Sequence, residues 1–80
     1  MTDMEKYIKV FMDLFGKKED EVKDLHYQDI LEWDSVGHMT LIAQLENVFD
    51  IRMDTDDIID FESFLKGMEI LKKYGVKFDD

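Results

Sequence analysis

Residues 33–49 read WDSVGHMTLIAQLENVF, and this stretch does most to decide the fold. Its first residues are typical of a helix start, and apolar side chains then recur at helical spacing. We therefore predict a helix over Val36–Phe49. A helical wheel places one set of side chains on the side that we expect to face the core: His38, Leu41, Ile42, Leu45, Val48 and Phe49.

The opposite side of this helix is short of charge for a solvated surface. It carries Val36, Met39, Thr40, Ala43, Glu46 and Asn47. Val36, Met39 and Ala43 form a small apolar strip just beyond Ser35. Single exposed apolar residues are common in monomers, but a strip rimmed by acidic residues is also typical of a docking surface for another protein.

Ser35 stands where an irregular acidic stretch meets the predicted helix, and two roles are open for it. Serine and aspartate are preferred N-caps, so capping is the commoner role for a serine in such a tetrapeptide. A helix N-terminus also offers unpaired N–H donors and a partial positive charge. The Ser35 hydroxyl is therefore a plausible place to attach a covalent anionic group.

Toward the N-terminus, a first helix is predicted from apolar residues at helical spacing: Met4, Tyr7, Ile8, Phe11, Leu14 and Phe15. Thr2 or Asp3 can cap this helix, and Gly16 can end it. A long acidic connection follows over residues 17–34, with a possible turn of helix at Glu19–Lys23. Its apolar residues are expected to attach it to the core, and they are Val22, Leu25, Ile30, Leu31 and Trp33.

Toward the C-terminus, we predict a short helix over Thr55–Asp60, capped by Thr55, and a last helix over Phe61–Tyr74 that stops at Gly75. The apolar stripe of the last helix is expected at Phe61, Phe64, Leu65, Met68 and Leu71. The predicted fold is all-α. It is a small bundle of three main helices and one short helix, forming a single domain over residues 1–80.

Composition narrows the classes of partner. Twenty acidic residues against ten basic ones give a formal charge of −10, which disfavours nucleic acid and anionic lipid and favours proteins with basic patches. The chain has no cysteine and no apolar run long enough for a membrane span, and its start does not read as a signal peptide. We expect a cytoplasmic monomer with no membrane partner. The aspartates near residue 57 do not match a calcium-binding loop, so no metal site is predicted.

Over nearly its whole length the chain resembles an acyl carrier protein. The resemblance rests on Asp34-Ser35-Val36 and on the helix Met39–Asp50, with Leu45-Glu46 and Phe49 at the expected distance in an acidic chain of this size. It implies an acyl-carrier-like bundle with a long first loop. It also implies that Ser35 carries 4′-phosphopantetheine, attached from coenzyme A by a phosphopantetheinyl transferase. Such a protein is not an enzyme but a carrier, which holds acyl intermediates as thioesters for its partner enzymes.

The resemblance also implies roles for other residues. The contacts to acyl-loading and acyl-processing enzymes with basic docking patches would be Asp34, Val36, Met39, Ala43 and Glu46. An acyl chain would enter near His38, Ile59 and Gly67, although close helix packing is the commoner reason for a glycine inside a helix such as Gly67. Glu32-Trp33 and Gly37-His38 depart from the pattern of fatty-acid carriers and favour a specialised biosynthetic pathway. The cargo itself stays open among fatty acyl, malonyl-type, hydroxyacyl and aminoacyl groups.

Two other functions fit the residues less well. An unmodified acidic helical interaction module would suit the charge and the six methionines, whose flexible side chains adapt to partners. A serine hydrolase built on Ser35 and His38 is remote, because two residues three apart on one helix give poor geometry for nucleophilic catalysis.

Overall fold

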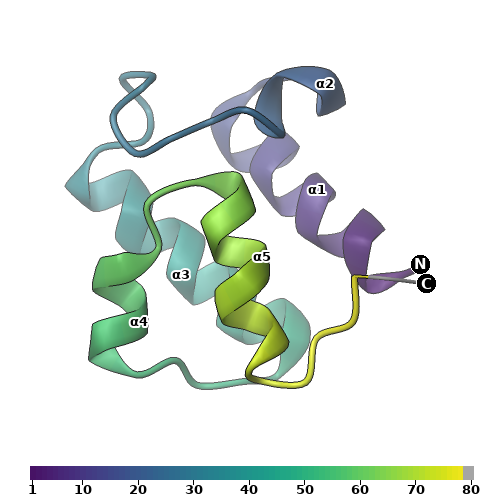
Figure 1. Ribbon diagram of the computed structural model, residues 1–80. Helices are drawn as coiled ribbons and strands as arrows, with labels where there is room; N and C mark the ends of the chain where they lie inside the picture. The colour runs from purple at the N-terminus through teal and green to yellow at the C-terminus, as the bar shows by residue number, and fades with distance from the viewer. Residues whose placement is uncertain (79–80) are drawn as a thin grey trace.

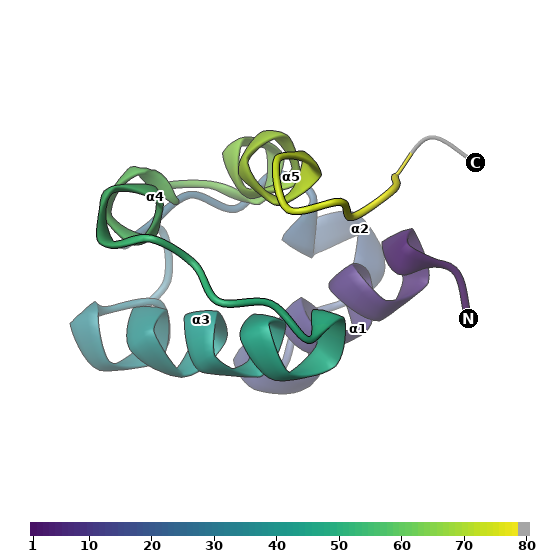
Figure 2. The ribbon, with the colours of Figure 1, turned by 90° about the horizontal axis from the view of Figure 1, so that it is seen from below.

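The computed structural model describes residues 1–78, and within them five helices form and no strand (Figure 1). The helices are α1 (Asp3–Phe15), α2 (Glu19–Val22), α3 (Ser35–Phe49), α4 (Thr55–Asp60) and α5 (Phe64–Lys72). In Figure 2, α1 and α3 form one layer, and α4 and α5 form a second layer that covers it. The predicted all-α bundle with three main helices is confirmed, and the possible turn after Gly16 is the short helix α2.

Both ends of α1 form as its sequence indicates. Thr2 is the N-cap, and its hydroxyl accepts a hydrogen bond from the Glu5 N–H at 3.1 Å, while the Glu5 carboxylate accepts one from the Thr2 N–H at 2.9 Å. This reciprocal pair satisfies two backbone donors that a helix start leaves free. Gly16 ends the helix in the left-handed conformation that glycine adopts without steric cost.

The start of α3 excludes one of the two roles that were open to Ser35, which is N-capping of the helix. Asp34 is the N-cap, since its carboxylate accepts a hydrogen bond from the Gly37 N–H at 2.9 Å. Ser35 is the first helical residue, so its hydroxyl is not needed for capping. On the inner side of α3, Leu41 and Leu45 are buried as predicted, whereas Val48 lies near the helix end and is 40% exposed.

The core is built mainly from aromatic rings, which pack at centroid distances of 4.7 to 5.8 Å. They come from both layers and from the first loop, and they are Tyr7, Phe11, Phe15, Trp33 and Phe64. Trp33 is fully buried and stacks on Phe15. Edge-to-face and offset contacts of this kind add to the stabilisation from buried area.

Trp33, Val22 and Leu25 attach the first loop to the core, as expected, but Leu31 does not. Leu31 is 93% exposed. The reason is a tight turn, in which the Gln28 N–H donates to the Trp33 carbonyl at 3.0 Å and the Trp33 N–H donates to the Ile30 carbonyl at 3.2 Å. This turn places Leu31 at its outer tip.

The last two helices differ from the prediction at their N-termini. The helix α4 has a different N-cap, and α5 begins later in the sequence. The N-cap of α4 is Asp54 rather than Thr55. The last helix starts at Phe64, because Ser63 caps it by accepting from the Lys66 N–H at 2.9 Å. The backbone before it is held extended by the first loop, through hydrogen bonds from the Tyr27 N–H to the Glu62 carbonyl and from the Phe64 N–H to the Leu25 carbonyl.

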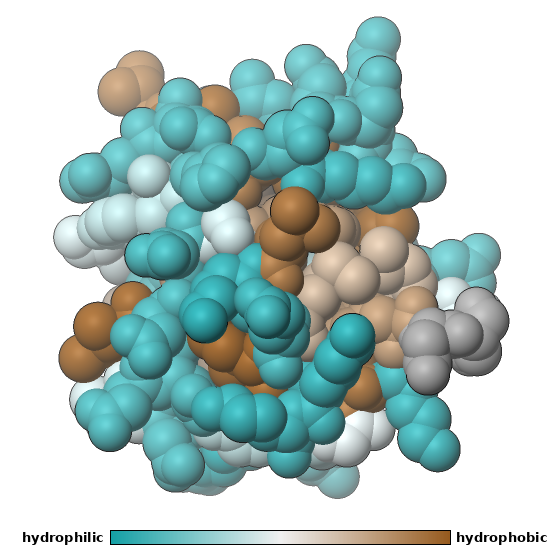
Figure 3. All heavy atoms as spheres, viewed as in Figure 1, coloured by the Kyte–Doolittle hydropathy of each residue, from teal (hydrophilic) through white to brown (hydrophobic). Residues whose placement is uncertain are grey.

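The buried face of α5 also differs from the predicted stripe. It consists of Phe64, Gly67, Ile70 and Leu71, while Leu65 is 63% exposed. Within residues 1–78, no helix combines the length and the apolar character needed to cross a bilayer. Figure 3 shows that hydrophilic side chains cover most of one face of the molecule, with hydrophobic groups between them.

Candidate functional site

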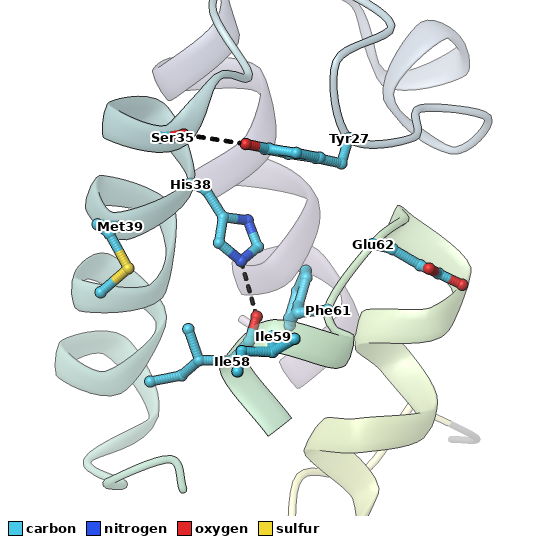
Figure 4. A pocket seen from close by; sticks show the side chains of 8 residues that line it. All are labelled: Tyr27, Ser35, His38, Met39, Ile58, Ile59, Phe61 and Glu62. Atoms are coloured by element: carbon cyan, nitrogen blue, oxygen red, sulfur yellow. Dashed lines mark hydrogen bonds between the residues drawn. The ribbon is translucent and has the colours of Figure 1, made fainter. Parts of the chain in front are cut away.

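A half-open cavity of about 310 Å³ lies between the first turns of α3, the first loop and α4 (Figure 4). Its volume is at the lower end of the range found for ligand pockets. The lining is mostly apolar and aromatic, and it consists of Tyr27, Ser35, His38, Met39, Ile58, Ile59, Phe61 and Glu62. The cavity therefore brings together four of the residues singled out from the sequence: Ser35, His38, Met39 and Ile59.

Ser35 lies at the mouth of this cavity and is exposed. Its Oγ is 3.1 Å from the hydroxyl oxygen of Tyr27, and either group can donate. Because Asp34 caps α3, the Ser35 hydroxyl is available at the positive end of the helix dipole. This position favours a negatively charged group attached to the serine.

His38 joins three parts of the chain through its two ring nitrogens. The Trp33 indole Nε1–H donates to His38 Nδ1 at 3.0 Å, since indole can only donate. Nε2 therefore carries the hydrogen and donates it to the Ile58 carbonyl at 2.8 Å. The neutral ring satisfies both partners, and Figure 4 shows Nε2 pointing at Ile58, away from Ser35.

Aromatic rings hold the His38 imidazole on several sides. It lies nearly parallel to Trp33, with centroids 6.2 Å apart, and contacts Tyr27 and Phe61 edge to face at 5.4 and 6.1 Å. With both nitrogens engaged, the ring does not serve as a base for Ser35. The remote hydrolase alternative therefore finds no support in this geometry.

Gly67 lies apart from the cavity lining. It is buried in α5, where an added Cβ would lie 2.2 Å from the ring of Phe61 and 2.3 Å from the hydroxyl oxygen of Tyr7. These distances are far below van der Waals contact. Gly67 therefore serves the close approach of α5 to the aromatic core, which is the packing role that its sequence left open.

The residues expected to contact partner enzymes fall into two groups. Val36 and Met39 are 76% and 53% exposed, and Ala43 is also exposed, so these three residues form an accessible apolar strip on α3. Asp34 and Glu46 also have structural roles. Asp34 caps α3, and Glu46 is partly buried with its carboxylate accepting from the Met53 N–H at 2.8 Å.

The sequence did not single out Tyr27, Ile58, Phe61 or Glu62 as site residues. Tyr27 belongs to an irregular loop, where no periodicity relates it to Ser35. Phe61 was assigned to the last helix, whereas it lies in the link between α4 and α5 and is buried beside His38. An aromatic residue in a long loop was the only available signal for Tyr27.

One acidic residue of α4, Asp57, serves packing, while Asp56 and Asp60 are exposed. Asp57 is buried and accepts hydrogen bonds from Lys73 Nζ and from the Tyr74 hydroxyl. These two donors hold the pKa of Asp57 below its ordinary value. Among residues 1–78, no group of three or more histidine or acidic side chains is placed to hold a metal ion.

Comparison of the chain with protein-family models, with curated proteins and with solved structures found no match.

Proposed function

We propose that this protein is an acyl carrier protein that bears 4′-phosphopantetheine on Ser35. The observation that carries the proposal is the position of the Ser35 hydroxyl. It is exposed, it is released from capping by Asp34, and it stands at the first residue of α3 beside an apolar cavity.

The residues around Ser35 suit this group. The N-terminus of α3 favours the negative charge of a phosphodiester. Met39, Ile59 and Phe61 give the neighbouring cavity apolar walls that suit an acyl chain. When bound, the group supplies the terminal thiol that forms thioesters, which the chain cannot provide because it has no cysteine.

In the attachment step, the Ser35 oxygen forms a bond to the pantetheine-side phosphorus of coenzyme A. The pyrophosphate bond breaks, adenosine 3′,5′-bisphosphate leaves, and the hydroxyl proton passes to a base of the transferase. Tyr27 orients the Ser35 hydroxyl through their hydrogen bond, and Asp34 holds the first turn of α3 in place. All catalytic groups belong to partner enzymes.

The docking surface is the apolar strip of Val36, Met39 and Ala43, surrounded by an acidic protein of formal charge −10. Partners with basic patches around an apolar centre complement it, and attraction between opposite charges speeds their encounter. Because the first turns of α3 carry no acidic side chain, contacts there are less charged than a uniformly acidic helix would make. This supports the assignment to a specialised biosynthetic pathway.

A second candidate is an unmodified acidic interaction module. It is favoured by large apolar side chains that are more than half exposed, which are Met1, Leu31, Val36, Met39, Ile59 and Leu65. Such residues serve docking equally well with or without a prosthetic group.

Intact-protein mass spectrometry separates the two candidates. The protein is incubated with coenzyme A, Mg²⁺ and a broad-specificity phosphopantetheinyl transferase. We expect one added phosphopantetheine on the wild type and on Thr40→Ala, a control that removes another hydroxyl of α3, and none on Ser35→Ala. An unchanged wild-type mass with several transferases would reject the carrier function and favour the interaction module.

A further inference from the structure

The cavity beside Ser35 is bounded by a contact between α3 and α4. His38 on α3 donates from Nε2 to the Ile58 carbonyl of α4 at 2.8 Å, and Trp33 holds the other side of its ring. Figure 4 shows the imidazole extending from α3 toward α4 between Ser35 and Phe61. A chain that passed from Ser35 into the bundle between these helices would have to break this bond.

The interior beyond His38 is filled by side chains. Trp33, Phe61 and Phe64 are each no more than 1% exposed, and even one methyl group on Gly67 would overlap Phe61 and Tyr7. Interiors packed at this density accept added groups only by moving their neighbours, which is unfavourable. A long acyl chain would therefore have to displace aromatic rings.

The helix that would have to move is held on a second side as well. Asp57 of α4 binds Lys73 and Tyr74, and the Tyr74 hydroxyl also accepts from the Asp54 N–H at 2.9 Å. Swinging α4 outward would break these hydrogen bonds together with that of His38. Hydrogen bonds on two sides of α4 therefore hold this helix against the rest of the bundle.

We infer that His38 closes the bundle interior to cargo, and that this protein holds a short acyl group in the cavity of about 310 Å³ beside Ser35. The inference rests on the proposed carrier function. It makes His38 a residue that limits cargo length, acting as a barrier and not through contact with the reacting thioester.

Cargo of increasing length tests the barrier. A broad-specificity transferase loads acetyl-, butyryl-, octanoyl- and dodecanoyl-phosphopantetheine from the matching coenzyme A thioesters, and mass spectrometry verifies each product. We expect the melting temperature to rise with the short groups and to gain nothing further with the long ones. Hydroxylamine should cleave the dodecanoyl thioester as fast as it cleaves free dodecanoyl-pantetheine. Protection of the dodecanoyl thioester, or a melting temperature that keeps rising with length, would overturn the inference.

Removing the barrier should change the length dependence. In His38→Ala, dodecanoyl loading should raise the melting temperature above that of the butyryl form and slow hydroxylamine cleavage. Ile70→Val is the matched control, because it weakens the buried face of α5 without touching the cavity, and it should keep the wild-type pattern. The same pattern in His38→Ala as in wild type would also reject the role of His38. If His38→Ala does not fold, the wild-type series alone decides.

A thioether series makes the test independent of the transferase. The chain has no cysteine, so Ser35→Cys gives a unique thiol that N-alkyl iodoacetamides of short and long chain can alkylate. The thiol proton passes to the buffer, the thiolate sulfur bonds to the methylene carbon, and iodide leaves. We expect the same plateau in melting temperature with chain length. If transferases do not modify the wild type but the melting temperature of alkylated Ser35→Cys stops rising with chain length, the carrier function is rejected and the closed interior is supported. A melting temperature that rises continuously with chain length rejects the closed interior.

Discussion

The indole nitrogen of Trp33 lies 3.0 Å from Nδ1 of His38, and this hydrogen bond ties the first loop to α3. It also sets the state of the imidazole, because the acceptor nitrogen cannot carry a hydrogen. The other nitrogen then donates to Ile58 on α4. One neutral side chain thereby joins three segments that are separate in the sequence.

Replacing His38 by alanine should lower the free energy of unfolding by about 1–3 kcal/mol, because it leaves the Trp33 N–H and the Ile58 carbonyl without their partner. Urea unfolding followed by circular dichroism measures the change. Gln44→Ala on the exposed side of the same helix should stay within about 0.5 kcal/mol of wild type. Equal effects of the two substitutions would mean that the bridge does not stabilise the fold.

Ser35→Ala and Asp34→Ala should differ in stability and in modification. Asp34→Ala should cost about 0.5–2 kcal/mol, since Asp34 is the N-cap of α3. Ser35→Ala should cost less than about 0.5 kcal/mol, since it loses only an exposed bond to Tyr27. Only Ser35→Ala should abolish phosphopantetheine attachment outright. A large loss of stability in Ser35→Ala would show that the serine is structural.

Gly67→Ala should destabilise the protein, although alanine is ordinarily favoured over glycine inside a helix by about 1 kcal/mol. The added methyl group overlaps Phe61 and Tyr7 in the core, and overpacking of this kind costs about 1–3 kcal/mol. Thermal unfolding gives the sign directly. Glu69→Ala on the exposed face of α5 is the control and should be nearly neutral. A stabilised Gly67→Ala would show that the core has room at this position.

Asp57 should make stability depend on pH at both extremes. Its pKa is lowered by hydrogen bonds from Lys73 and Tyr74, so its contribution is complete above the ordinary value of 3.8 and is lost as pH falls through the lowered pKa. The pKa values of Lys73 and Tyr74 are raised, mainly by their hydrogen bonds to Asp57, above 10.5 and 10.0. Their contribution is complete below pH 10.0 and is lost as pH rises through the raised values.

Asp57→Asn removes the charge from this cluster and should flatten both limbs of the profile. Denaturant unfolding between pH 2 and pH 11, on the wild type and on Asp57→Asn, measures this. Asp13→Asn is a suitable control, because Asp13 forms only an exposed pair with Lys9 on α1. Profiles for Asp57→Asn that parallel the wild type would contradict the proposed linkage.

Val36→Asp should slow acyl loading and weaken partner binding with little change in stability, because it places a charge in the apolar strip of α3, where Val36 is 76% exposed. Ala43→Glu should act in the same way. Leu65→Asp is the matched control, since it makes the same charge change on α5, where Leu65 is 63% exposed. If both α3 variants load at the wild-type rate, α3 is not the docking surface.

The local features of the site followed from the sequence because they depend on neighbours along the chain. Apolar spacing indicated α1 and α3, and Gly16 and Asp34 mark their ends through backbone preferences that act over a few residues. The position of Ser35 at a helix start could be predicted because a helix start is itself a local property. The bounds of α4 followed for the same reason.

The start of α5 and the cavity could not be predicted from local sequence patterns. The first loop binds the backbone around Ser63, which delays α5 until Phe64 and turns Leu65 outward, and no local pattern encodes that contact. Tertiary packing also brings Tyr27 next to Ser35, which is 8 residues away in the sequence, and His38 next to Ile58, which is 20 residues away. Local preferences therefore determined which segments are helical and that Ser35 stands at the start of α3. Only packing between distant segments decided what surrounds that serine, because hydrogen bonds and ring contacts between them form when the whole core is assembled.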